Sequence, residues 1–308
     1  MRTVGRSIAA VGVDLGGTKL ATALFAGDGT ILSKSIIALR GCGGAEAGRL
    51  VGREIAKAFQ CAAGKRLSIQ AIGVSVPGVA WRQGTVWAPN IAGWEKYPLR
   101  QEIADAISPR RIPVRIESDR VCSILGEAWK GAARGCANAI FMAVGTGIGA
   151  GIRVEGRVLR GADGLAGAVG WMALGRPFVP AYKECGCFEC HASGRGLAKS
   201  AGAPDARAVF EALRRHDPAA CKTARQAVEL WGIAVANLVS IFNPEKVIFG
   251  GGVFGPAARF LDDIRDEAAQ WAQPLAMKRV KLEISALGAD AGLYGAALIA
   301  RQARRRPK

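Results

Sequence analysis

The stretch "VGVDLGGTKLATALF", residues 11–25, decides the fold expected for this chain. Its apolar beginning predicts a buried strand, its paired glycines predict a tight turn, and its apolar end predicts a second strand. The following "GDGTIL", residues 27–32, predicts another turn and a third strand. The chain therefore opens with three strands joined by tight turns, and not with a strand that leads into a helix.

The same pattern returns in "NAIFMAVGTGIGAGIRVEGRVLRG", residues 138–161. Further strands are expected after each opening, and apolar spacing predicts helices over residues 45–63, 119–132, 206–215, 225–242, 256–272 and 291–303. Two similar halves that mix strands with helices predict an α/β fold with two lobes around a central cleft.

The 308 residues carry a formal charge of +17, and half of them are hydrophobic. These totals indicate a globular protein and exclude a disordered chain. The basic excess favours anionic partners, although a solvated basic surface is the simpler explanation. No signal peptide is visible, and glycines break the uncharged run Gly135–Ile152, so we expect no membrane span. Eight cysteines without an export signal fit a reducing cytoplasm.

The first glycine turn carries groups that suit a nucleotide phosphate. Asp14 stands at the end of the first predicted strand and is followed by Gly16, Gly17, Thr18 and Lys19. Glycines let backbone N–H groups approach an anion, and the carboxylate could hold a hydrated Mg²⁺ beside it. An ordinary hairpin with a surface lysine remains the alternative for this turn taken alone.

Two further glycine clusters strengthen the phosphate interpretation. The second half repeats the turn with Gly145, Thr146 and Gly147. A third cluster follows a predicted strand and precedes a predicted helix, and it comprises Gly250, Gly251 and Gly252. One such cluster is weak support for nucleotide binding, but three in this order within a duplicated α/β frame predict it.

From about Val11 to Ala297 the chain resembles the ROK family of sugar kinases and repressors, in the actin-like/hexokinase superfamily. The resemblance is carried by "VGVDLGGTK", "SVPGV", "APNIAGW", "ESDRVCSILGE", "VGTGIGAGI", "GCFECHASG", "VIFGGGV" and "ADAGLYGAA". It implies a duplicated ribonuclease-H-like fold that binds ATP and Mg²⁺, and it suggests a homodimer. We place a small lobe at residues 1–118 plus 291–308 and a larger lobe at residues 119–290.

By the same resemblance, Asp119 is the general base that accepts the proton of a sugar hydroxyl during attack on the γ-phosphate. The residue follows the predicted strand "VRIES" and begins a helix. An acidic residue there also stabilises the helix through its dipole, without any catalytic role. The family match further assigns the sugar site to Gly78, Asn90, Ser118, Glu189 and Trp171. Gly78 and Asn90 could equally be turn residues, and Glu189 a surface acid.

The chain departs from the family pattern in its sugar site. Ser118 precedes the base where the family has Asn, which removes one side-chain amide. Ala168 and Trp171 replace a Glu and a zinc-binding His. An indole at Trp171 could stack on a pyranose face or simply fill the lost volume.

The zinc motif of the family is also depleted. Cys187 aligns with its last cysteine, but three of the four zinc ligands are absent. Cys185, Cys187, Cys190 and His191 are candidate ligands, yet one seven-residue loop would have to supply all four. We therefore expect no zinc, and we interpret these cysteines as packing residues of a loop.

These observations favour an ATP-dependent hexose kinase of the glucokinase type. A non-catalytic sugar sensor, a kinase for an amino sugar, and a polyphosphate-dependent kinase remain alternatives. Family repressors carry a DNA-binding segment before the first glycine motif, and Asp14 leaves no room for one. The expected partners are therefore a small sugar and ATP, and not nucleic acid or membrane.

Overall fold

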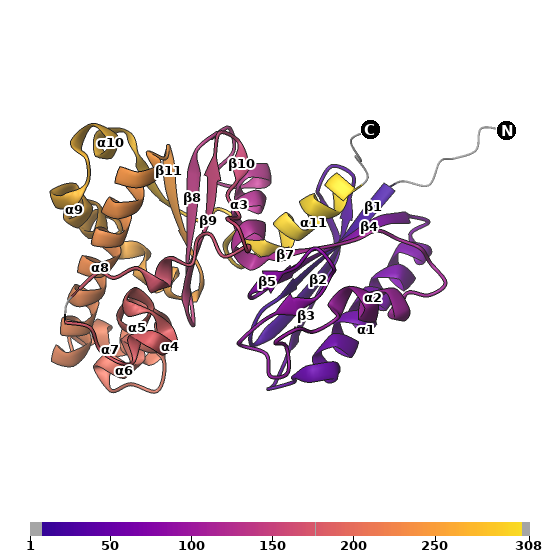
Figure 1. Cartoon of the computed structure of the whole chain (residues 1–308), viewed down its shortest axis with the longest axis horizontal. Coiled ribbons are helices and arrows are strands. Elements are labelled where there is room, and N and C mark those ends of the chain that lie inside the picture. The colour runs from indigo at the N-terminus through magenta and orange to yellow at the C-terminus, as the bar shows by residue number, and fades with distance from the viewer. Residues whose placement is uncertain (1–7, 176, 304–308) are drawn as a thin grey trace. The chain divides into compact units, whose positions relative to one another are not determined.

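The structure, a computed structural model, describes residues 8–175 and 177–303, and its chain divides into two compact units (Figure 1). The first unit comprises Met1–Lys130, Ala162–Gly164 and Asp290–Lys308, and the second comprises Gly131–Gly161 and Leu165–Ala289. The first unit thus continues past Ser118, where the sequence-based boundary ended it.

The first unit contains five longer strands and four helices among its described residues. Their bounds are β1 (Ile8–Leu15), β2 (Lys19–Ala26), β3 (Ile31–Ala38), α1 (Gly44–Gly64), β4 (Ser68–Val76), α2 (Leu99–Ala106), β7 (Val114–Ser118), α3 (Asp119–Lys130) and α11 (Ala291–Ala303). A small hairpin is formed by β5 (Val79–Ala80) and β6 (Val86–Trp87).

The second unit opens with its own three strands and is rich in helices. Its bounds are β8 (Ala139–Val144), β9 (Ile148–Val154), β10 (Arg157–Val158), α4 (Tyr182–Cys185), α5 (Cys187–Ala192), α6 (Gly194–Ala201), α7 (Ala206–Arg214), α8 (Pro218–Phe242), β11 (Lys246–Gly250), α9 (Leu261–Trp271), α10 (Pro274–Arg279) and β12 (Lys281–Ile284). Short 3-10 helices are η1 (Val169–Trp171), η2 (Gly252–Phe254) and η3 (Pro256–Phe260).

The two sheets have the same topology, which confirms the predicted duplication. The first sheet has the order β3-β2-β1-β4-β7, and the second has the order β10-β9-β8-β11-β12. In both sheets the first three strands pair antiparallel, the fourth strand (β4 or β11) pairs parallel with the first, and the fifth (β7 or β12) pairs parallel with the fourth. Crossovers through helices make those parallel pairings possible.

Helices cover both faces of the first sheet. Figure 1 shows α1 and α2 on one face and α11 on the other. Val11 and Val13 belong to the core beneath α1 and α2, together with Ile55. Since successive strand residues point to opposite faces, Gly12 faces α11, and a Cβ there would lie 2.9 Å from the Leu293 carbonyl oxygen. The small residue lets α11 rest directly on the strand.

Close packing of α3 on α11 explains why the first unit includes residues 119–130. A side chain at Gly126 would collide with the Ala291 carbonyl, and one at Gly295 would collide with the backbone of Cys122. Two glycines on facing helices thus allow backbone contact. The sequence-based boundary overlooked this contact because the partner helix lies far away in the chain.

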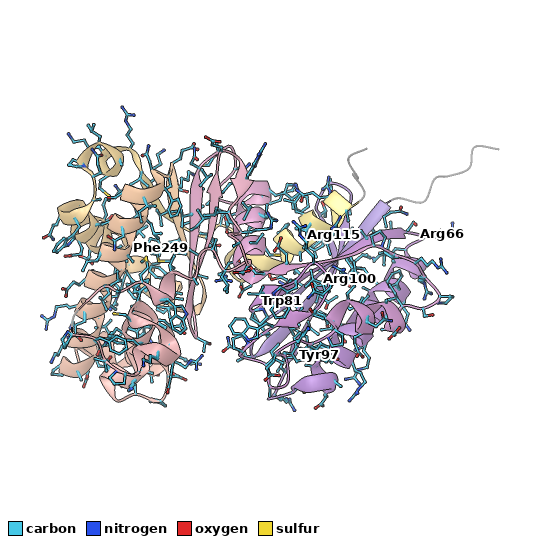
Figure 2. The ribbon with its side chains drawn as sticks, in the orientation of Figure 1. Arg66, Trp81, Tyr97, Arg100, Arg115 and Phe249 are labelled. Atoms are coloured by element: carbon cyan, nitrogen blue, oxygen red, sulfur yellow. A yellow bond between two sulfur atoms is a disulfide. The ribbon has the colours of Figure 1, made fainter. Side chains whose placement is uncertain are left out.

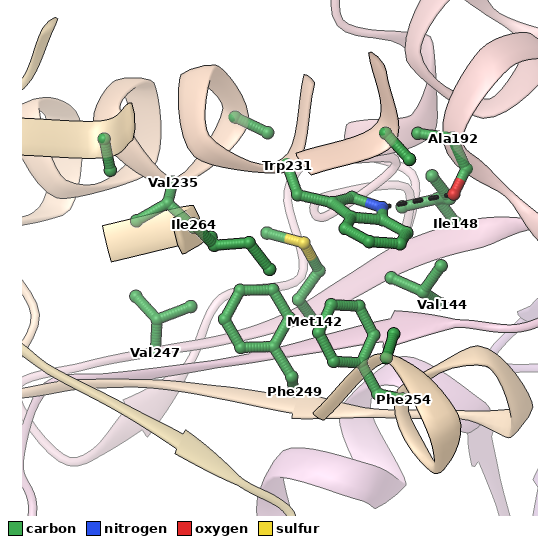
Figure 3. Packing of buried hydrophobic residues seen from close by; sticks show 14 of the residues in the cluster. Met142, Val144, Ile148, Ala192, Trp231, Val235, Val247, Phe249, Phe254 and Ile264 are labelled. Atoms are coloured by element: carbon green, nitrogen blue, oxygen red, sulfur yellow. Dashed lines mark hydrogen bonds between the residues drawn. The ribbon is translucent and has the colours of Figure 1, made fainter. Parts of the chain in front are cut away.

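Aromatic packing against α8 forms the core of the second unit (Figure 3). Trp231 lies over Phe254, with ring centroids 5.0 Å apart, and Phe249 stacks on Phe254 at 4.4 Å. All three rings are at most 2% exposed. Burying side chains of this size contributes about 2 kcal/mol each relative to exposure. Figure 2 labels Phe249 among the surrounding side chains.

Several element boundaries differ from the sequence-based expectation. Helix α8 begins at Pro218 and not near residue 225, because Asp217 caps it by accepting the Ala220 N–H at 2.9 Å. The stretch 182–192, expected as a loop, forms α4 and α5. No helix within residues 8–175 and 177–303 combines the length and apolarity that a membrane crossing requires.

Candidate functional site

Asp14 lies near the end of β1, where it pairs in register with Ala21 of β2 and Ser75 of β4. Its carboxylate oxygens face Gly292 at the start of α11. A Cβ at that glycine would lie 2.7 Å from Oδ1 and 2.9 Å from Oδ2. The missing side chain of Gly292 therefore makes room for the Asp14 carboxylate.

Burial controls the protonation of Asp14. The surrounding protein excludes water and raises the pKa of its carboxyl group. The nearby Ser75 hydroxyl and the Lys19 ammonium lower that pKa, and the Asp290 carboxylate raises it. Because desolvation is the largest effect, the ionised form of Asp14 is costly unless a cation stands beside it.

Asp119 is the first residue of α3, directly after β7. Its Oδ1 accepts the backbone N–H of Arg120 at 2.8 Å. Burial raises the pKa of Asp119 to about 6; the Arg120 guanidinium lowers it, and the Asp14 carboxylate raises it. Since β1, β4 and β7 run parallel, the two carboxyl groups stand at the same end of the first sheet.

The single carboxylate of Asp14 is compatible with a magnesium ion that is bound mainly by other groups. Within the described ranges, no group of three or more His, Cys, Asp or Glu side chains could hold a metal ion. Mg²⁺ commonly takes only one or two carboxylates and completes its coordination with phosphates and water. Asp14 could supply one such carboxylate, and the nearby negative charge of Asp119 would add to the attraction for a cation.

The first glycine turn links β1 to β2. The Gly16 N–H donates to the Lys19 carbonyl at 2.9 Å, and Gly17, Thr18 and Lys19 are exposed. A Cβ at Gly17 would lie 3.6 Å from the Asn90 Cβ. The structure therefore brings one predicted sugar residue, Asn90, next to the predicted phosphate turn.

Two other predicted sugar residues have structural roles. A side chain at Gly78 would overlap the Trp87 carbonyl oxygen, so this glycine permits close approach of the β5–β6 hairpin. The buried Ser118 hydroxyl accepts the Val121 N–H at 3.4 Å at the start of α3. Sugar binding by Gly78 and Ser118 stays a prediction.

The second glycine turn connects β8 to β9 in the second unit. The Gly145 N–H donates to the Gly147 carbonyl at 2.9 Å, and the Gly145 carbonyl accepts the Gly194 N–H at 2.7 Å. The Arg195 guanidinium lies 3.4 Å from the carbonyl oxygen of the exposed Thr146. This turn is thus fastened to the start of α6.

Glu189, on α5, contacts the same turn. Its Oε2 accepts the Ile148 N–H at 2.7 Å. A Cβ at Gly147 would lie 2.7 Å from that oxygen, and a Cβ at Gly170 would lie 3.0 Å from it. Burial raises the pKa of Glu189, while the Ile148 N–H and the Arg195 charge lower it. The carboxylate is therefore held between two glycines and is not a free surface acid.

The third glycine cluster follows β11. Gly250 is buried, and a side chain there would collide with the Phe141 ring. Gly251, with φ +88°, packs against the Val144 backbone, and both Gly251 and Gly252 are exposed. The structure thus gives Gly250 a packing role and leaves the other two accessible.

Trp171 closes η1 and is 55% exposed. This exposure leaves the ring accessible, and both expectations for this residue, stacking on a sugar and filling of the lost volume, stay predictions. Its Cα packs against Gly186, where an added Cβ would lie 2.7 Å away. The neighbouring Gly170 packs against the side chain of Glu189, so the backbone of Trp171 lies one residue from that contact.

The cysteine cluster does not fit a zinc site. Cys185 and Cys190 form a disulfide, with Cα atoms 5.5 Å apart, and Cys187 is a buried free thiol. Disulfide sulfurs are not thiolate ligands. The expectation that all three cysteines are single packing residues of a loop is wrong for this pair. A disulfide also differs from the free thiols expected in a reducing compartment.

Sequence reasoning assigned no role to Ser75, Arg195 or Gly292, which lie against predicted site residues. Ser75 and Gly292 occur in the motifs "SVPGV" and "ADAGLYGAA", so a signal for both was present in the chain. Arg195 carried no signal, since its proximity to Thr146 depends on how α6 packs.

Comparison with known proteins identifies the family. The sequence profile of the ROK family matches residues 10–303. A glucokinase of Halalkalibacterium halodurans is 31% identical, in an alignment that covers 95% of this chain and 94% of that protein.

Solved structures agree in fold. A ROK family glucokinase from Streptomyces griseus in complex with glucose and AMPPNP gives a TM-score of 0.79 at 29% identity, covering 96% of this chain and 99% of that one. A ROK hexokinase from Thermus thermophilus gives 0.78 at 34% identity, covering 96% and 98%. These likenesses confirm the expected duplicated fold of the actin-like ATPases, and the chain belongs to the ROK family.

Proposed function

We propose that this protein is an ATP-dependent sugar kinase of the glucokinase type, with Asp119 as its general base. The supporting observation is the carboxyl group of Asp119, which begins α3 beside Asp14 and has a pKa of about 6. Such a carboxylate is ionised at neutral pH, yet it is a stronger base than an ordinary aspartate. It would accept the hydroxyl proton of a hexose while the oxygen attacks the γ-phosphorus and ADP leaves.

The nucleotide side of the reaction needs positioning and charge neutralisation. Exposed backbone and side-chain donors at Gly17, Thr18 and Lys19 suit phosphate oxygens, as do those at Thr146 and Gly252. Asp14 would hold Mg²⁺, which supplies charge neutralisation at the phosphates when it is bound with ATP. A neighbouring cation also relieves the cost of ionising the partly buried Asp14.

The sugar side is assigned to Asn90, Glu189 and Trp171. A carboxylate and an amide suit paired hydroxyl groups, and an exposed indole offers an apolar face to a pyranose ring. Glu189 already accepts one backbone N–H, and this bond fixes its orientation. Ala168 leaves out the carboxylate that the family usually has near the anomeric end, so recognition there would depend on Trp171.

A coupled assay of ADP release tests the assigned base. Asp119→Asn should lower kcat by about 10³-fold, within the usual range for general-base catalysis, with little change in the KM for ATP. Asp205→Asn is the matched control, since Asp205 also stands at the start of a helix, where it caps α7 by accepting the Ala208 N–H at 2.8 Å. Unchanged turnover in Asp119→Asn would refute the assignment of the base.

A substrate panel tests the reaction class. Hexoses and amino sugars would be paired with ATP or with inorganic polyphosphate, and we expect the highest kcat/KM for a hexose with ATP. A higher kcat/KM for an amino sugar would make that sugar the acceptor in place of a hexose. A higher kcat/KM with polyphosphate would make polyphosphate the donor in place of ATP. Sugar binding by calorimetry without nucleotide binding or turnover would favour a non-catalytic sensor.

We further propose, from the family resemblance, that the protein acts as a homodimer in the cytoplasm, without nucleic acid or membrane partners. Light scattering after size exclusion should give twice the 32.2 kDa chain mass. A monomeric mass at micromolar concentration would contradict the dimer.

A further inference from the structure

The disulfide Cys185–Cys190 joins the last residue of α4 to α5 across Gly186. Both cysteines are partly exposed, whereas Cys187 between them is buried. An external thiol can therefore reach this disulfide. Neither cysteine has a role in the proposed chemistry, so the purpose of the bond needs its own account.

Helix α5 is anchored without the disulfide. Phe188 and Ala192 are fully buried. The Trp231 indole N–H donates to the Ala192 carbonyl at 3.1 Å, as the dashed line in Figure 3 shows. Glu189 is tied in addition to the Ile148 N–H. Opening the disulfide would thus leave α5 and Glu189 in place.

Helix α4 lacks such an anchor. None of its residues is buried. Its other side-chain contacts are made by Tyr182: the hydroxyl lies 2.8 Å from His191 Nε2 and interacts with the buried Cys187 thiol of α5, and the ring meets that of Phe178, which is 63% exposed. Noncovalent contacts of this kind contribute about 1 kcal/mol each. The disulfide is therefore the covalent cross-link that holds α4 to α5.

The junction held by this tether borders the predicted sugar site. Gly186 has φ +73° and packs against the Gly170 carbonyl and the Trp171 Cα. Gly170 in turn contacts the side chain of Glu189. A shift of α4 about Gly186 would consequently act on the backbone of Trp171.

We propose that the Cys185–Cys190 disulfide is a thiol-controlled clamp that positions Trp171 for sugar binding. The role in sugar binding rests on the proposed function. A low-molecular-weight dithiol opens the clamp by breaking the S–S bond. Each cysteine gains one electron and one proton and becomes a thiol, while the dithiol is oxidised to its disulfide. Both sulfurs lie near the Ala181 carbonyl, at 3.5 and 3.7 Å, so each new thiol has an acceptor there.

The first test compares oxidised protein with protein reduced by dithiothreitol. Reduction should raise the KM for the sugar by about fivefold or more, with the KM for ATP and kcat unchanged. Alkylation of the protein unfolded in denaturant, followed by mass spectrometry, reports the bond itself: six of the eight cysteines should react before reduction, and all eight after it. The clamp would be refuted if reduction made all eight cysteines reactive but left the KM for the sugar unchanged. It would also be refuted if all eight cysteines reacted before reduction.

Matched variants separate this disulfide from other thiols. Cys185→Ser and Cys190→Ser should each show the reduced-state sugar KM without dithiothreitol and no further response to it. Cys221→Ser, which changes a partly buried free thiol of the second unit, should keep the full response. A response that survives in Cys185→Ser would refute the proposal.

A measurement without turnover keeps the clamp testable if the protein phosphorylates no sugar. Reduction should speed hydrogen exchange in a peptide that covers α4, while a peptide that covers α5 stays protected. Equal exchange of α4 in both redox states would refute the clamp whatever the substrate. Faster exchange without any kinase activity would leave the clamp standing and refute the proposed function alone.

Discussion

Glu189 Oε2 accepts the backbone N–H of Ile148 at 2.7 Å, although the two residues are 41 positions apart in the chain. The bond joins α5 to the first residue of β9. It orients a carboxylate that burial makes harder to ionise. The position of Glu189 relative to the glycine turn is thus set by hydrogen bonding and not by chain proximity.

Glu189→Gln should raise the KM for the sugar by about tenfold, because a charged acceptor becomes neutral, while the amide oxygen can still accept the Ile148 N–H. Steady-state kinetics at fixed ATP measures it. Glu211→Gln is the control, since Glu211 on α7 pairs with the exposed Arg207. An equal KM in wild type and Glu189→Gln would exclude Glu189 from sugar binding.

Asp119→Asn should be more stable than wild type at pH 7. The carboxyl pKa is about 6 in the folded protein against 3.8 for the ordinary group, so the folded state binds the proton more tightly. This stabilisation is fully present below pH 4 and is lost as the pH rises through 6. Asparagine mimics the protonated form, and should gain about 1 to 2 kcal/mol at pH 7 after allowance for partial exposure. Thermal unfolding measures it; the gain should vanish near pH 4, and a pH-independent gain would contradict the raised pKa.

Gly292→Ala should lower kcat by about 10²-fold, because the added Cβ would displace the Asp14 carboxylate. Gly64→Ala is the matched control, since Gly64 also lies in a helix and an added Cβ there meets no atom within 4 Å. Turnover and unfolding temperature are measured for both. Full activity in a folded Gly292→Ala variant would show that the position of Asp14 does not matter for turnover.

Trp171→Ala should raise the KM for the sugar by about five- to tenfold, with little change in stability because the indole is 55% exposed. Trp271→Ala tests for a general effect of losing an exposed indole, since Trp271 is 64% exposed at the end of α9. If both variants kept the wild-type KM, Trp171 would have no part in sugar recognition.

Elemental analysis of the purified protein should find no stoichiometric zinc, because Cys185 and Cys190 are joined and leave Cys187 as the lone thiol of the cluster. The same analysis of reduced protein is the control, because reduction frees the sulfurs of Cys185 and Cys190. One zinc per chain in the oxidised protein would contradict the disulfide.

Local patterns predicted most of the fold. The strand openings at residues 11–25 and 138–161 were correctly expected because apolar runs and glycine turns are encoded within a few residues. The short helices α4 and α5 were missed because segments of 4 and 6 residues are too short to display the periodic spacing of a helix. The start of α8 was placed too late, although Asp217 and Pro218 carry a helix-start signal.

The sequence by itself determined the duplicated α/β fold, the family and the candidate residues Asp14, Asp119 and Glu189, because motifs keep these in fixed order along the chain. Only the tertiary structure decided that Gly292 makes room for Asp14 and that Cys185 pairs with Cys190. The first contact joins residues from opposite ends of the chain. The second depends on the turn at Gly186, and neither follows from a local pattern of apolar and polar residues.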